Sequence, residues 1–478
     1  MIGGSSFPMD MKQTARDIFW EAVRAADPYL GIKRFVHREG DDVVIGGVRY
    51  TAALFPKVIV VGGGKASARM AEGLEDVLGD RIAGGWINTK YGHNTPNYAM
   101  HNLGTPLSRP LGRMTVHECG HPVPDENGIR GTIRIIELLK SADTGTLVIC
   151  LLSGGGSALM PAPGEGITLA EKQKVTRLLL AAGASIEEIN AVRKHLSLLK
   201  GGGMARLAAP ARLHVLILSD VIGDRLDTIA SGPAVGDPTT FRDCIGIAER
   251  YGILEALPPA VRARLERGVR GGIPETAKPG DPFLDGAGNT LIGNNRMSVD
   301  AARRAAERMG YHALVLSTVI EGEAREIGTF FGAVASEIHH SGNPIPIPAC
   351  VIGGGETTVT LRGSGFTPHV RAHAGTPSGK GGRNQEMALK CASCIAGLPE
   401  TVFLSGGTDG TDGPTDAAGG VVDGETMQAG KEKNLEIHAF LAENDSYRYL
   451  EQVGGLLMTG PTGTNVMDIH ILLVGEPT

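Results

Sequence analysis

One pattern occurs three times in the first half of this chain and limits the folds that it can adopt. A short apolar run, at residues 57–61, 146–152 and 213–218, is followed at once by a loop of glycines or small polar residues. The first loop leads into a segment with Met70, Leu74 and Leu78 on one helical face. Repeated units of strand, loop and helix predict a mostly parallel, Rossmann-like sheet with helices on both faces.

The second half of the chain shows the same alternation. We expect strands at 289–293, 312–318, 348–352, 401–404 and 469–474, and helices at 298–309, 323–340 and 385–396. A helical pattern at 9–26 opens the chain, and residues 43–51, interrupted by Gly46-Gly47, suit a small hairpin. The fold class is therefore α/β in both halves.

A chain of 478 residues exceeds what one hydrophobic core usually organises, so we expect two domains. Pro258-Pro259 and the Gly- and Pro-rich run 271–282 mark the expected boundary. This predicts an N-terminal α/β domain at 1–254, a linker at 255–282 and a C-terminal α/β domain at 283–478, with an interdomain cleft. Clefts of this kind often bind small ligands.

Composition excludes several classes of function. Apolar residues make up 42% of the chain and charged residues 21%, as in ordinary globular proteins. The net charge is -6 and no Lys/Arg block stands out, so a nucleic-acid partner is not expected. No apolar run has the length of a membrane span, and the first ten residues lack the features of a signal peptide. We expect a cytoplasmic protein without a membrane partner, and leave a homodimer open.

Among the six cysteines, only Cys391 and Cys394 form a C-x-x-C pair. Such a pair can serve redox or metal chemistry. The alternative is two thiols on one helix.

The first glycine loop, Gly62-Gly63-Gly64-Lys65-Ala66-Ser67, has the composition of an anion site at the start of a helix. Gly63, Gly64 and Ser67 are candidates for nucleotide binding, and Lys65 adds a full positive charge. The loop does not match the Walker pattern, because Lys65 is followed by Ala66, and it only approaches the dinucleotide fingerprint. A glycine turn that allows close packing of helix on strand is the alternative.

The second loop, Ser153-Gly154-Gly155-Gly156-Ser157, follows a strand in the same way and is a second candidate phosphate loop. Arg193, Lys194 and Lys200 follow in and just after a helical region, where one of them could bind an anion or all three could form a solvated face, and His195 is a further binding candidate. Asp220 comes directly after a strand, where a carboxylate can meet a metal-phosphate complex.

The C-terminal third contains several glycine loops with charged residues. Glu356 follows Gly353-Gly354-Gly355, and Lys380, Arg383 and Asn384 lie in Gly379-Lys380-Gly381-Gly382-Arg383-Asn384. A cation at a helix start opposes the helix dipole, so Arg383 suggests a bound anion there. A further glycine-rich loop, at residues 405–416, carries the candidate binding residue Thr408 and the candidate metal ligands Asp409 and Asp412. Asx turns are the alternative role for these two aspartates.

Taken in order along the chain, these motifs resemble a known family. The resemblance rests on Gly62-Gly63-Gly64-Lys65-Ala66, residues 152–158, Arg193-Lys194-His195-Leu196-Ser197, Ser219-Asp220-Val221, Ala230-Ser231-Gly232-Pro233, residues 379–386 and 407–419, and Thr459-Gly460-Pro461-Thr462-Gly463-Thr464-Asn465-Val466. The chain resembles the ATP-dependent glycerate kinases that make 2-phosphoglycerate, whose C-terminal part is called the MOFRL domain. The resemblance implies two α/β domains with a cleft, in which Lys65 and Arg383 serve phosphoryl transfer.

The resulting hypothesis is that D-glycerate and Mg-ATP react, with loop amides and Lys65 on phosphate oxygens and Arg383 on the transferring group. Asp220, Asp409 or Asp412 would hold Mg²⁺ or take the hydroxyl proton, and Lys194 or Lys200 would bind the glycerate carboxylate. Similar proteins are often named hydroxypyruvate reductase, so NAD(P)H-dependent reduction stays as the alternative, and a non-catalytic sensor is a third. The residues leave the 2- or 3-hydroxyl open, and the resemblance favours the 2-position.

Overall fold

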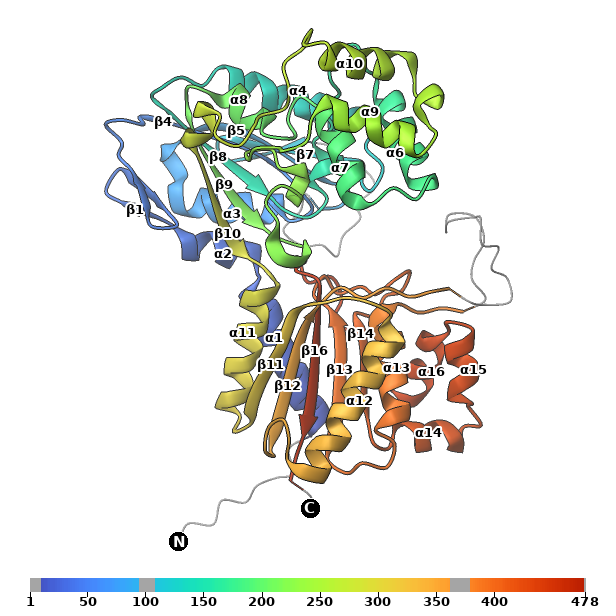
Figure 1. The fold of residues 1–478 in the computed structure, drawn as a ribbon. Coiled ribbons are helices and arrows are strands. Elements are labelled where there is room, and N and C mark those ends of the chain that lie inside the picture. The colour runs from blue at the N-terminus through green and yellow to red at the C-terminus, as the bar shows by residue number, and fades with distance from the viewer. Residues whose placement is uncertain (1–9, 94–107, 362–378, 477–478) are drawn as a thin grey trace. The chain divides into compact units, whose positions relative to one another are not determined.

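A computed structural model describes residues 10–93, 108–361 and 379–476 of the chain. The chain forms two compact units, each with its own sheet. The first unit comprises Pro28–Ile292, and the second comprises Met1–Asp27 together with Gly293–Thr478. Figure 1 colours the chain from one end to the other, so that each unit can be followed. The predicted α/β class is confirmed for both units.

The first unit is built on a seven-stranded sheet with the order β10-β9-β8-β4-β5-β7-β6. β4 pairs in parallel with both β5 and β8, and the pairs β5–β7 and β8–β9 are parallel too. Only the edge strand β6 is seen to run antiparallel to its neighbour among the pairs described. The predicted parallel sheet is therefore confirmed here. The strands are β4 (Lys57–Gly63), β5 (Ile82–Lys90), β6 (Ser108–Leu111), β7 (Met114–Cys119), β8 (Thr146–Leu152), β9 (Arg212–Leu218) and β10 (Ala287–Gly293).

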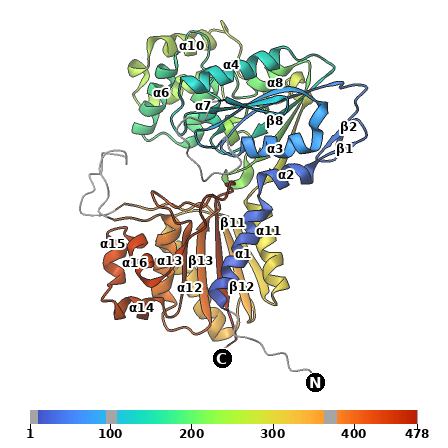
Figure 2. The same cartoon turned by 180° about the vertical axis from the view of Figure 1, so that it is seen from behind.

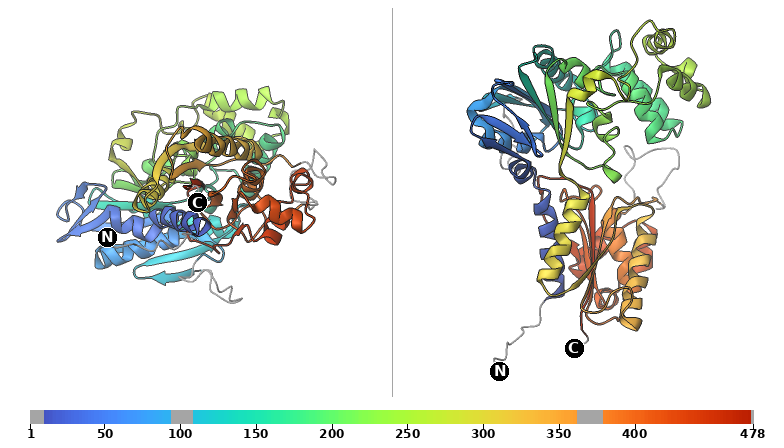
Figure 3. Two further views of the ribbon diagram at one scale, coloured as in Figure 1. Left: turned by 90° about the horizontal axis from the view of Figure 1, so that it is seen from below. Right: turned by 60° about the vertical axis from the view of Figure 1, so that its left-hand side comes forward.

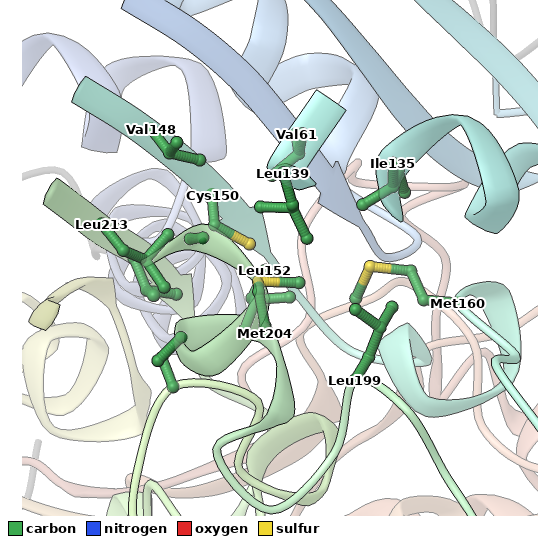
Figure 4. Packing of buried hydrophobic residues seen from close by; sticks show 14 of the residues in the cluster. Val61, Ile135, Leu139, Val148, Cys150, Leu152, Met160, Leu199, Met204 and Leu213 are labelled. Atoms are coloured by element: carbon green, nitrogen blue, oxygen red, sulfur yellow. The ribbon is translucent and has the colours of Figure 1, made fainter. Parts of the chain in front are cut away.

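Apolar residues on alternate positions of these strands face helices on both sides of the sheet. Val61, Cys150 and Leu152 pack against Ile135 and Leu139 from a helix on one face, as Figure 4 shows. This packing fixes where the central strands end. The helices of the unit are α2 (Pro28–Phe35), α3 (Ser67–Leu78), α4 (Glu126–Lys140), α5 (Gly156–Leu159), α6 (Leu169–Ala181), α7 (Ile186–His195), α8 (Gly203–Ala208), α9 (Phe241–Arg250) and α10 (Pro259–Val269).

The predicted hairpin at 43–51 is confirmed within a small three-stranded antiparallel sheet. It consists of β1 (Val36–Glu39), β2 (Asp42–Ile45) and β3 (Val48–Tyr50).

The segment 255–282, expected as a linker, packs into the first unit. Pro259 begins α10, where a proline costs no hydrogen bond. Val261 and Leu265 of this helix are buried with Phe241 of α9. The Gly- and Pro-rich run beyond it is tied down as well, because the amide of Ala277 donates to the carbonyl of Gly201 at 3.0 Å. Prolines and glycines here mark turns on the surface of one unit.

The second unit has a six-stranded sheet with the order β11-β12-β16-β13-β14-β15. β11 and β12 are parallel, whereas β16 runs antiparallel to β12 and to β13, between which it lies (Figure 1). β14 is antiparallel to β13 and to β15. The prediction of parallel pairing therefore holds in this sheet only for β11 with β12. The strands are β11 (His312–Ile320), β12 (Ala349–Gly355), β13 (Thr401–Gly407), β14 (Gly419–Asp423), β15 (Leu456–Leu457) and β16 (Asp468–Val474).

Two pairs of helices cover the faces of this sheet. In β13, Val402 and Leu404 pack beneath α1 and α11, while Phe403 between them faces α12 and α13. Figure 2 shows α1 lying across the sheet, and the right panel of Figure 3 separates the two helix layers. The helices are α1 (Met11–Ala25), α11 (Asn295–Arg308), α12 (Ala324–Ser341), α13 (Arg383–Cys394), α14 (Thr426–Glu432), α15 (Ile437–Ala442) and α16 (Ser446–Val453).

The division of the chain differs from the expected boundaries at both ends. α1 packs in the second unit, where Lys12 pairs with Asp423 at 2.6 Å and Phe19 is fully buried. β10, expected in the C-terminal domain, lies beside β9 in the sheet of the first unit. Hydrophobic faces alone do not say which sheet they cover, so the sequence could not show this exchange. No helix among the described residues is both long and apolar enough to cross a membrane.

Candidate active site

The two glycine loops of the first unit meet at one edge of its sheet. β4 and β8 are parallel, with Gly63 opposite Leu152, so both strands end at this edge. The chain turns to β5 and β7 on one side of β4 and later to β8 and β9 on the other. Such a reversal of strand order is where open α/β sheets bind ligands. The loops touch, because the Lys65 amide donates to the Gly154 carbonyl at 2.9 Å.

The first glycine loop uses its own polar groups to hold its shape. The Gly64 amide donates to the Asn88 carbonyl at 3.2 Å, and the Ala66 amide donates to Ser153 Oγ at 3.0 Å. Ser67 Oγ donates to the Leu151 carbonyl at 3.3 Å and is buried. A side chain at Gly63 or Gly64 would have no room against Met160 or Ser153. The close packing of the two loops therefore depends on Gly63, Gly64, Ser67 and Ser153. This matches the alternative of a glycine turn that allows close packing.

Some backbone amides of the second glycine loop have no hydrogen-bond acceptor among the described residues. Within the described part of the chain, the amides of Gly154, Gly155 and Ser157 make no hydrogen bond. Gly155 has φ +84°, a left-handed conformation that glycine adopts freely. Gly156 opens α5, and a side chain there would press on the Gly63 carbonyl. Three amides in one turn can converge on an anion.

Lys65 projects its charge beside this turn. Its Cγ lies near Gly155, where an added Cβ would sit 3.5 Å away, and the His121 ring borders the same glycine. The ammonium group forms no hydrogen bond or ion pair with any described residue. Burial, followed by the charges of Lys65 and Lys90, lowers the pKa of His121 to about 4, so its ring is neutral at pH 7. An unpaired cation therefore stands next to free amide donors.

Asp220 follows β9 and reaches the same loop. Its carboxylate lies so close to Gly154 that a Cβ at this position would collide with Oδ2. A glycine is needed here because of that approach. Several residues predicted from the sequence therefore lie together in the first unit: Lys65, Gly154, Gly155, Ser157 and Asp220.

The basic residues predicted in and just after α7 have different partners. Lys194 is buried and pairs with Asp237 at 3.4 Å, and His195 Nε2 hydrogen-bonds Glu275 at 3.0 Å. Both side chains are engaged by carboxylates of the protein. Lys200 instead donates to Ser157 Oγ at 2.7 Å and so reaches the glycine loop. Of the three, only Lys200 touches the candidate phosphate site.

The second unit gathers its predicted residues at one edge of its own sheet. Asp468, the first residue of β16, lies opposite both Gly355 and Gly407. Arg383, the first residue of α13, donates to Asp468 through Nε at 2.6 Å and Nη2 at 3.0 Å. Its Nη1 pairs with Glu356 at 3.0 Å. Arg383 is thus held in a fixed orientation by two carboxylates.

The cation at the start of α13 is explained by these acids. Burial alone would lower the pKa of Arg383, but hydrogen bonds to Asp468 and the charges of Asp468, Glu356 and Asp412 raise it above its ordinary value. The anion that the sequence suggested at this helix start is provided by the chain. With a third of its side chain exposed, at 33%, Arg383 still has a face open to solvent.

Asp412 caps α13. Its Oδ2 accepts from the Gln385 amide at 2.9 Å and its Oδ1 from the Asn384 amide at 3.2 Å. Burial, with help from the charge of Asp468, raises the pKa of Asp412 to about 7. Asn384 is buried and accepts from Ser405 Oγ at 2.6 Å. Both residues shape the loop that carries Arg383, and the structure gives Asp412 a capping role.

The remaining predicted residues of this loop region serve mainly to build it. Thr408 is buried, and its hydroxyl donates to the Met467 carbonyl at 2.6 Å. Asp409 Oδ1 accepts from the Thr411 amide at 3.0 Å, which is the predicted Asx turn. Lys380 lies over the Tyr447 ring, 3.3 Å from its centre, and pairs with Asp416 at 3.8 Å.

Metal ligands are sparse in the part of the chain that the structure describes. It contains no group of three His, Cys, Asp or Glu side chains arranged to hold an ion. Cys391 and Cys394 both lie in α13 with free thiols, which confirms two thiols on a helix. Mg²⁺ needs only one or two carboxylates when it arrives on a nucleotide. Asp220 is a candidate for such a carboxylate because it lies at Gly154 of the second glycine loop. Both oxygens of Asp412 accept hydrogen bonds from amides.

Three residues at these sites were not selected from the sequence. His121 borders Gly155, Ser231 shares a hydrogen bond of 3.1 Å with Ser157, and Asp468 holds Arg383. Ser231 has φ +61°, which is unusual for a residue other than glycine and is often found at functional sites. Its motif, Ala230-Ser231-Gly232-Pro233, was visible in the sequence. His121 and Asp468 gave no such signal.

The chain is similar to known proteins over nearly its full length. Residues 14–266 match a domain of unknown function (DUF4147), and residues 349–468 match the MOFRL family. Glycerate 2-kinase of Pyrococcus horikoshii is 42% identical over 98% of this chain and 98% of its own length. D-glycerate 2-kinase of Thermotoga maritima is 41% identical over 98% of this chain and 99% of its own length.

A solved structure extends the likeness to the fold. The crystal structure of glycerate kinase from Thermotoga maritima matches with a TM-score of 0.82 and 39% identity, and the match covers 98% of this chain and 100% of that one. The likeness therefore extends over both units. On this similarity, the chain belongs to the glycerate kinase family with a C-terminal MOFRL domain.

Proposed function

We propose that this protein transfers the γ-phosphoryl group of ATP to D-glycerate and releases 2-phosphoglycerate. The observation that carries the proposal is the Lys65 ammonium, unpaired within the described residues, beside a glycine turn with three unused amides. Fixed cations and amides aimed at one point stabilise phosphate charge without reorganising during the reaction. The names of the relatives support glycerate as the acceptor.

In this proposal the two glycine loops divide the work. The first loop holds Lys65 rigidly through backbone hydrogen bonds, so that its ammonium meets a phosphate oxygen with little loss of freedom. The second loop donates from Gly154, Gly155 and Ser157 to the phosphate chain of the nucleotide. The glycerate hydroxyl attacks the terminal phosphorus in line, and the leaving oxygen is that of ADP.

Mg²⁺ would neutralise charge on the β- and γ-phosphates, as in other phosphoryl transfers. Asp220 is the residue that we assign to hold it. The carboxylate at Gly154 lies at the same loop as the free amides, and Gly154 has no side chain to displace it. Asp409 is the second candidate, and its Oδ1 accepts from the Thr411 amide in an Asx turn.

Arg383 is assigned to the charge that develops on the transferring group. Its guanidinium is oriented by Asp468 and Glu356, so it would meet that group in one fixed orientation. The family resemblance implies the same role for this residue.

The test is a purified enzyme assay with product identification. The protein with ATP, MgCl₂ and D-glycerate is expected to release ADP, and enolase added without a mutase should consume the product directly. Omission of MgCl₂ should abolish turnover.

Each alternative has its own outcome in the same assay. Product that enolase accepts only after phosphoglycerate mutase is added would place the phosphate on the 3-hydroxyl. Oxidation of NADH or NADPH with hydroxypyruvate in the absence of ATP would favour a reductase. Binding of ATP without release of ADP would favour a sensor, and either result would overturn the proposal.

A further inference from the structure

Among the residues that the structure describes, three basic side chains of the first unit have no acidic partner. Lys172 lies on α6, Arg193 on α7 and Lys200 shortly after α7. Lys172 Nζ is buried and hydrogen-bonds to no described residue. Arg193 likewise makes no hydrogen bond or ion pair within the described chain. In the described part of the chain, Lys200 Nζ donates only to neutral oxygens, Ser157 Oγ at 2.7 Å and the Ala230 carbonyl at 3.3 Å.

The neighbouring cation on α7 shows how unusual this is. Lys194 follows Arg193 directly and is paired with Asp237 at 3.4 Å and with Asp227 at 3.8 Å. Asp237 is fully buried and also accepts from Thr276. Within the described ranges, Lys194 is therefore paired with two carboxylates, whereas the adjacent Arg193 is paired with none.

Leaving these charges unpaired costs stability. Burial lowers the pKa of Lys172 to about 7, with further lowering by the charges of Arg193 and Arg264. The pKa of Lys200 is also lowered by burial and then by Lys172 and Arg193, so the cations lie close enough to repel one another. An anion bound among them would relieve both effects. A buried cluster with this cost is expected to persist where a ligand uses it.

Hydroxyl groups connect the cluster to the phosphate loop. Ser157 accepts from Lys200 and shares a hydrogen bond of 3.1 Å with Ser231. Ser231 Oγ in turn donates to Asn190 Oδ1 at 3.4 Å, and Asn190 lies one turn before Arg193 on α7. Ser157 also carries one of the unused amides of the second glycine loop. The cluster and the proposed phosphate site therefore meet at Ser157.

We propose that Lys172, Arg193 and Lys200 bind the carboxylate of the acceptor acid, whose hydroxyl then lies toward Ser157 and the phosphate loop. This inference rests on the proposed function and adds a specificity site to it. The acceptor class is a short hydroxy acid, because the carboxylate and the reacting hydroxyl must reach two adjoining sites. Arg193 offers two parallel N–H donors, which match a carboxylate. Lys65 and the amides of Gly154 and Gly155 already serve the nucleotide phosphates.

The test compares Lys172→Met and Arg193→Met with the control Lys174→Met, an exposed lysine of the same helix. At saturating ATP, each test variant should raise the KM for D-glycerate by about 10- to 100-fold. This is the loss of affinity expected when one or two charge-assisted hydrogen bonds are removed. The KM for ATP should stay within about twofold of wild type. Lys174→Met should change neither constant.

A binding measurement makes the result independent of turnover. Calorimetric titration with D-glycerate, with glyceramide and with inorganic phosphate, all without nucleotide, should show glycerate binding that Lys172→Met weakens. Glyceramide, which lacks the carboxylate, should bind wild type and variant equally poorly. Thermal unfolding of Lys172→Met should be no lower than that of wild type, because an unpaired buried cation is removed.

The outcomes separate this inference from the proposed function. If wild type releases no ADP but binds glycerate through Lys172, the kinase assignment fails and the carboxylate site stands. If wild type turns over and both variants keep the wild-type KM for glycerate, the carboxylate site is refuted and the kinase assignment stands. A rise in the KM for ATP and in the dissociation constant of phosphate, with glycerate unchanged, would assign the cluster to phosphate and overturn the proposal.

Discussion

The two units present opposite solutions for a basic side chain at the end of a sheet. In the first unit, Lys65 stands without a partner among the described residues, next to amides that are also unused. In the second unit, Arg383 is bound by Asp468 and Glu356, and Asp412 occupies the amides at the start of α13. The first arrangement is ready to accept a polyanion, whereas the second orients a cation in advance. The proposed phosphoryl transfer would use both.

The strongest test of this contrast is removal of the unpaired cation. Lys65→Ala should lower kcat by about 10²- to 10³-fold, because one fixed charge donor is lost from the transferring phosphate. Its melting temperature should stay near that of wild type, since the ammonium makes no hydrogen bond or ion pair in the described chain. Lys57→Ala, at the exposed start of β4, is the matched control and should keep wild-type turnover. Equal kcat values for the two variants would remove Lys65 from the mechanism.

A second test acts on the loop that offers its amides. Gly154→Ala places a Cβ against Asp220 Oδ2, so the carboxylate or the loop must move. Displacement of this order should lower kcat by about 10- to 100-fold. Gly246→Ala is the control, because nothing lies within 4 Å of the Cβ added there in α9. Steady-state kinetics of both variants at several MgCl₂ concentrations would check the result, and an unaffected Gly154→Ala enzyme would argue against Asp220 at this site.

The third test releases the cation that the second unit holds. Asp468→Asn removes the charge that Arg383 binds through Nε and Nη2, and should destabilise the fold by about 1.5–3 kcal/mol. We expect kcat to fall about tenfold, because Arg383 would lose its orientation. Urea unfolding and kinetics on one preparation measure both effects. A variant that loses stability but keeps full kcat would show that the pairing serves the fold alone.

The smallest effect concerns the pH dependence of stability. The pKa of Asp412, about 7 in the folded protein, exceeds the ordinary value of about 3.9. The folded state therefore keeps this proton between about pH 4 and pH 7 while the unfolded state loses it, so stability from this group is lost as the pH rises through that range. Asp412→Asn should reduce the fall in melting temperature between pH 5 and pH 8. The control Asp409→Asn should follow the wild-type profile.

A pH profile of Asp412→Asn that is as steep as that of wild type would assign the buried proton to another group. The contrast between the units would then rest on the Arg383 ion pairs alone.

Local sequence patterns predicted the elements of this fold well, because each strand or helix is encoded by its own residues. β8 at Thr146–Leu152 matches its predicted range, and β4, β9, β11, β12, β13 and β16 begin within one residue of theirs. Long-range pairing was harder to predict. β16 enters between β12 and β13 in the antiparallel sense, and α1 joins the sheet at the other end of the chain. Such choices depend on which hydrophobic faces fit together.

The candidate site was predictable where chemistry follows directly on a strand. Lys65, Asp220 and the second glycine loop were found because the carboxyl ends of parallel strands share one edge. The roles of individual residues were less predictable. Ser67, Asn384 and Thr408 were candidates for ligand binding, but their side chains form hydrogen bonds within the protein. Lys172 was missed because a lysine on an amphipathic helix usually lies in water. Its buried ammonium could only be recognised from the packing of α6.

A double-mutant cycle tests most directly whether the free cation and the oriented cation serve one chemical step. Lys65→Ala, Arg383→Lys and their combination are compared by kcat at saturating ATP and D-glycerate. The account predicts that the double variant loses less than the product of the two single losses, with a coupling free energy of about 1 kcal/mol or more. Strictly multiplicative losses, or an Arg383→Lys enzyme with wild-type kcat, would contradict it.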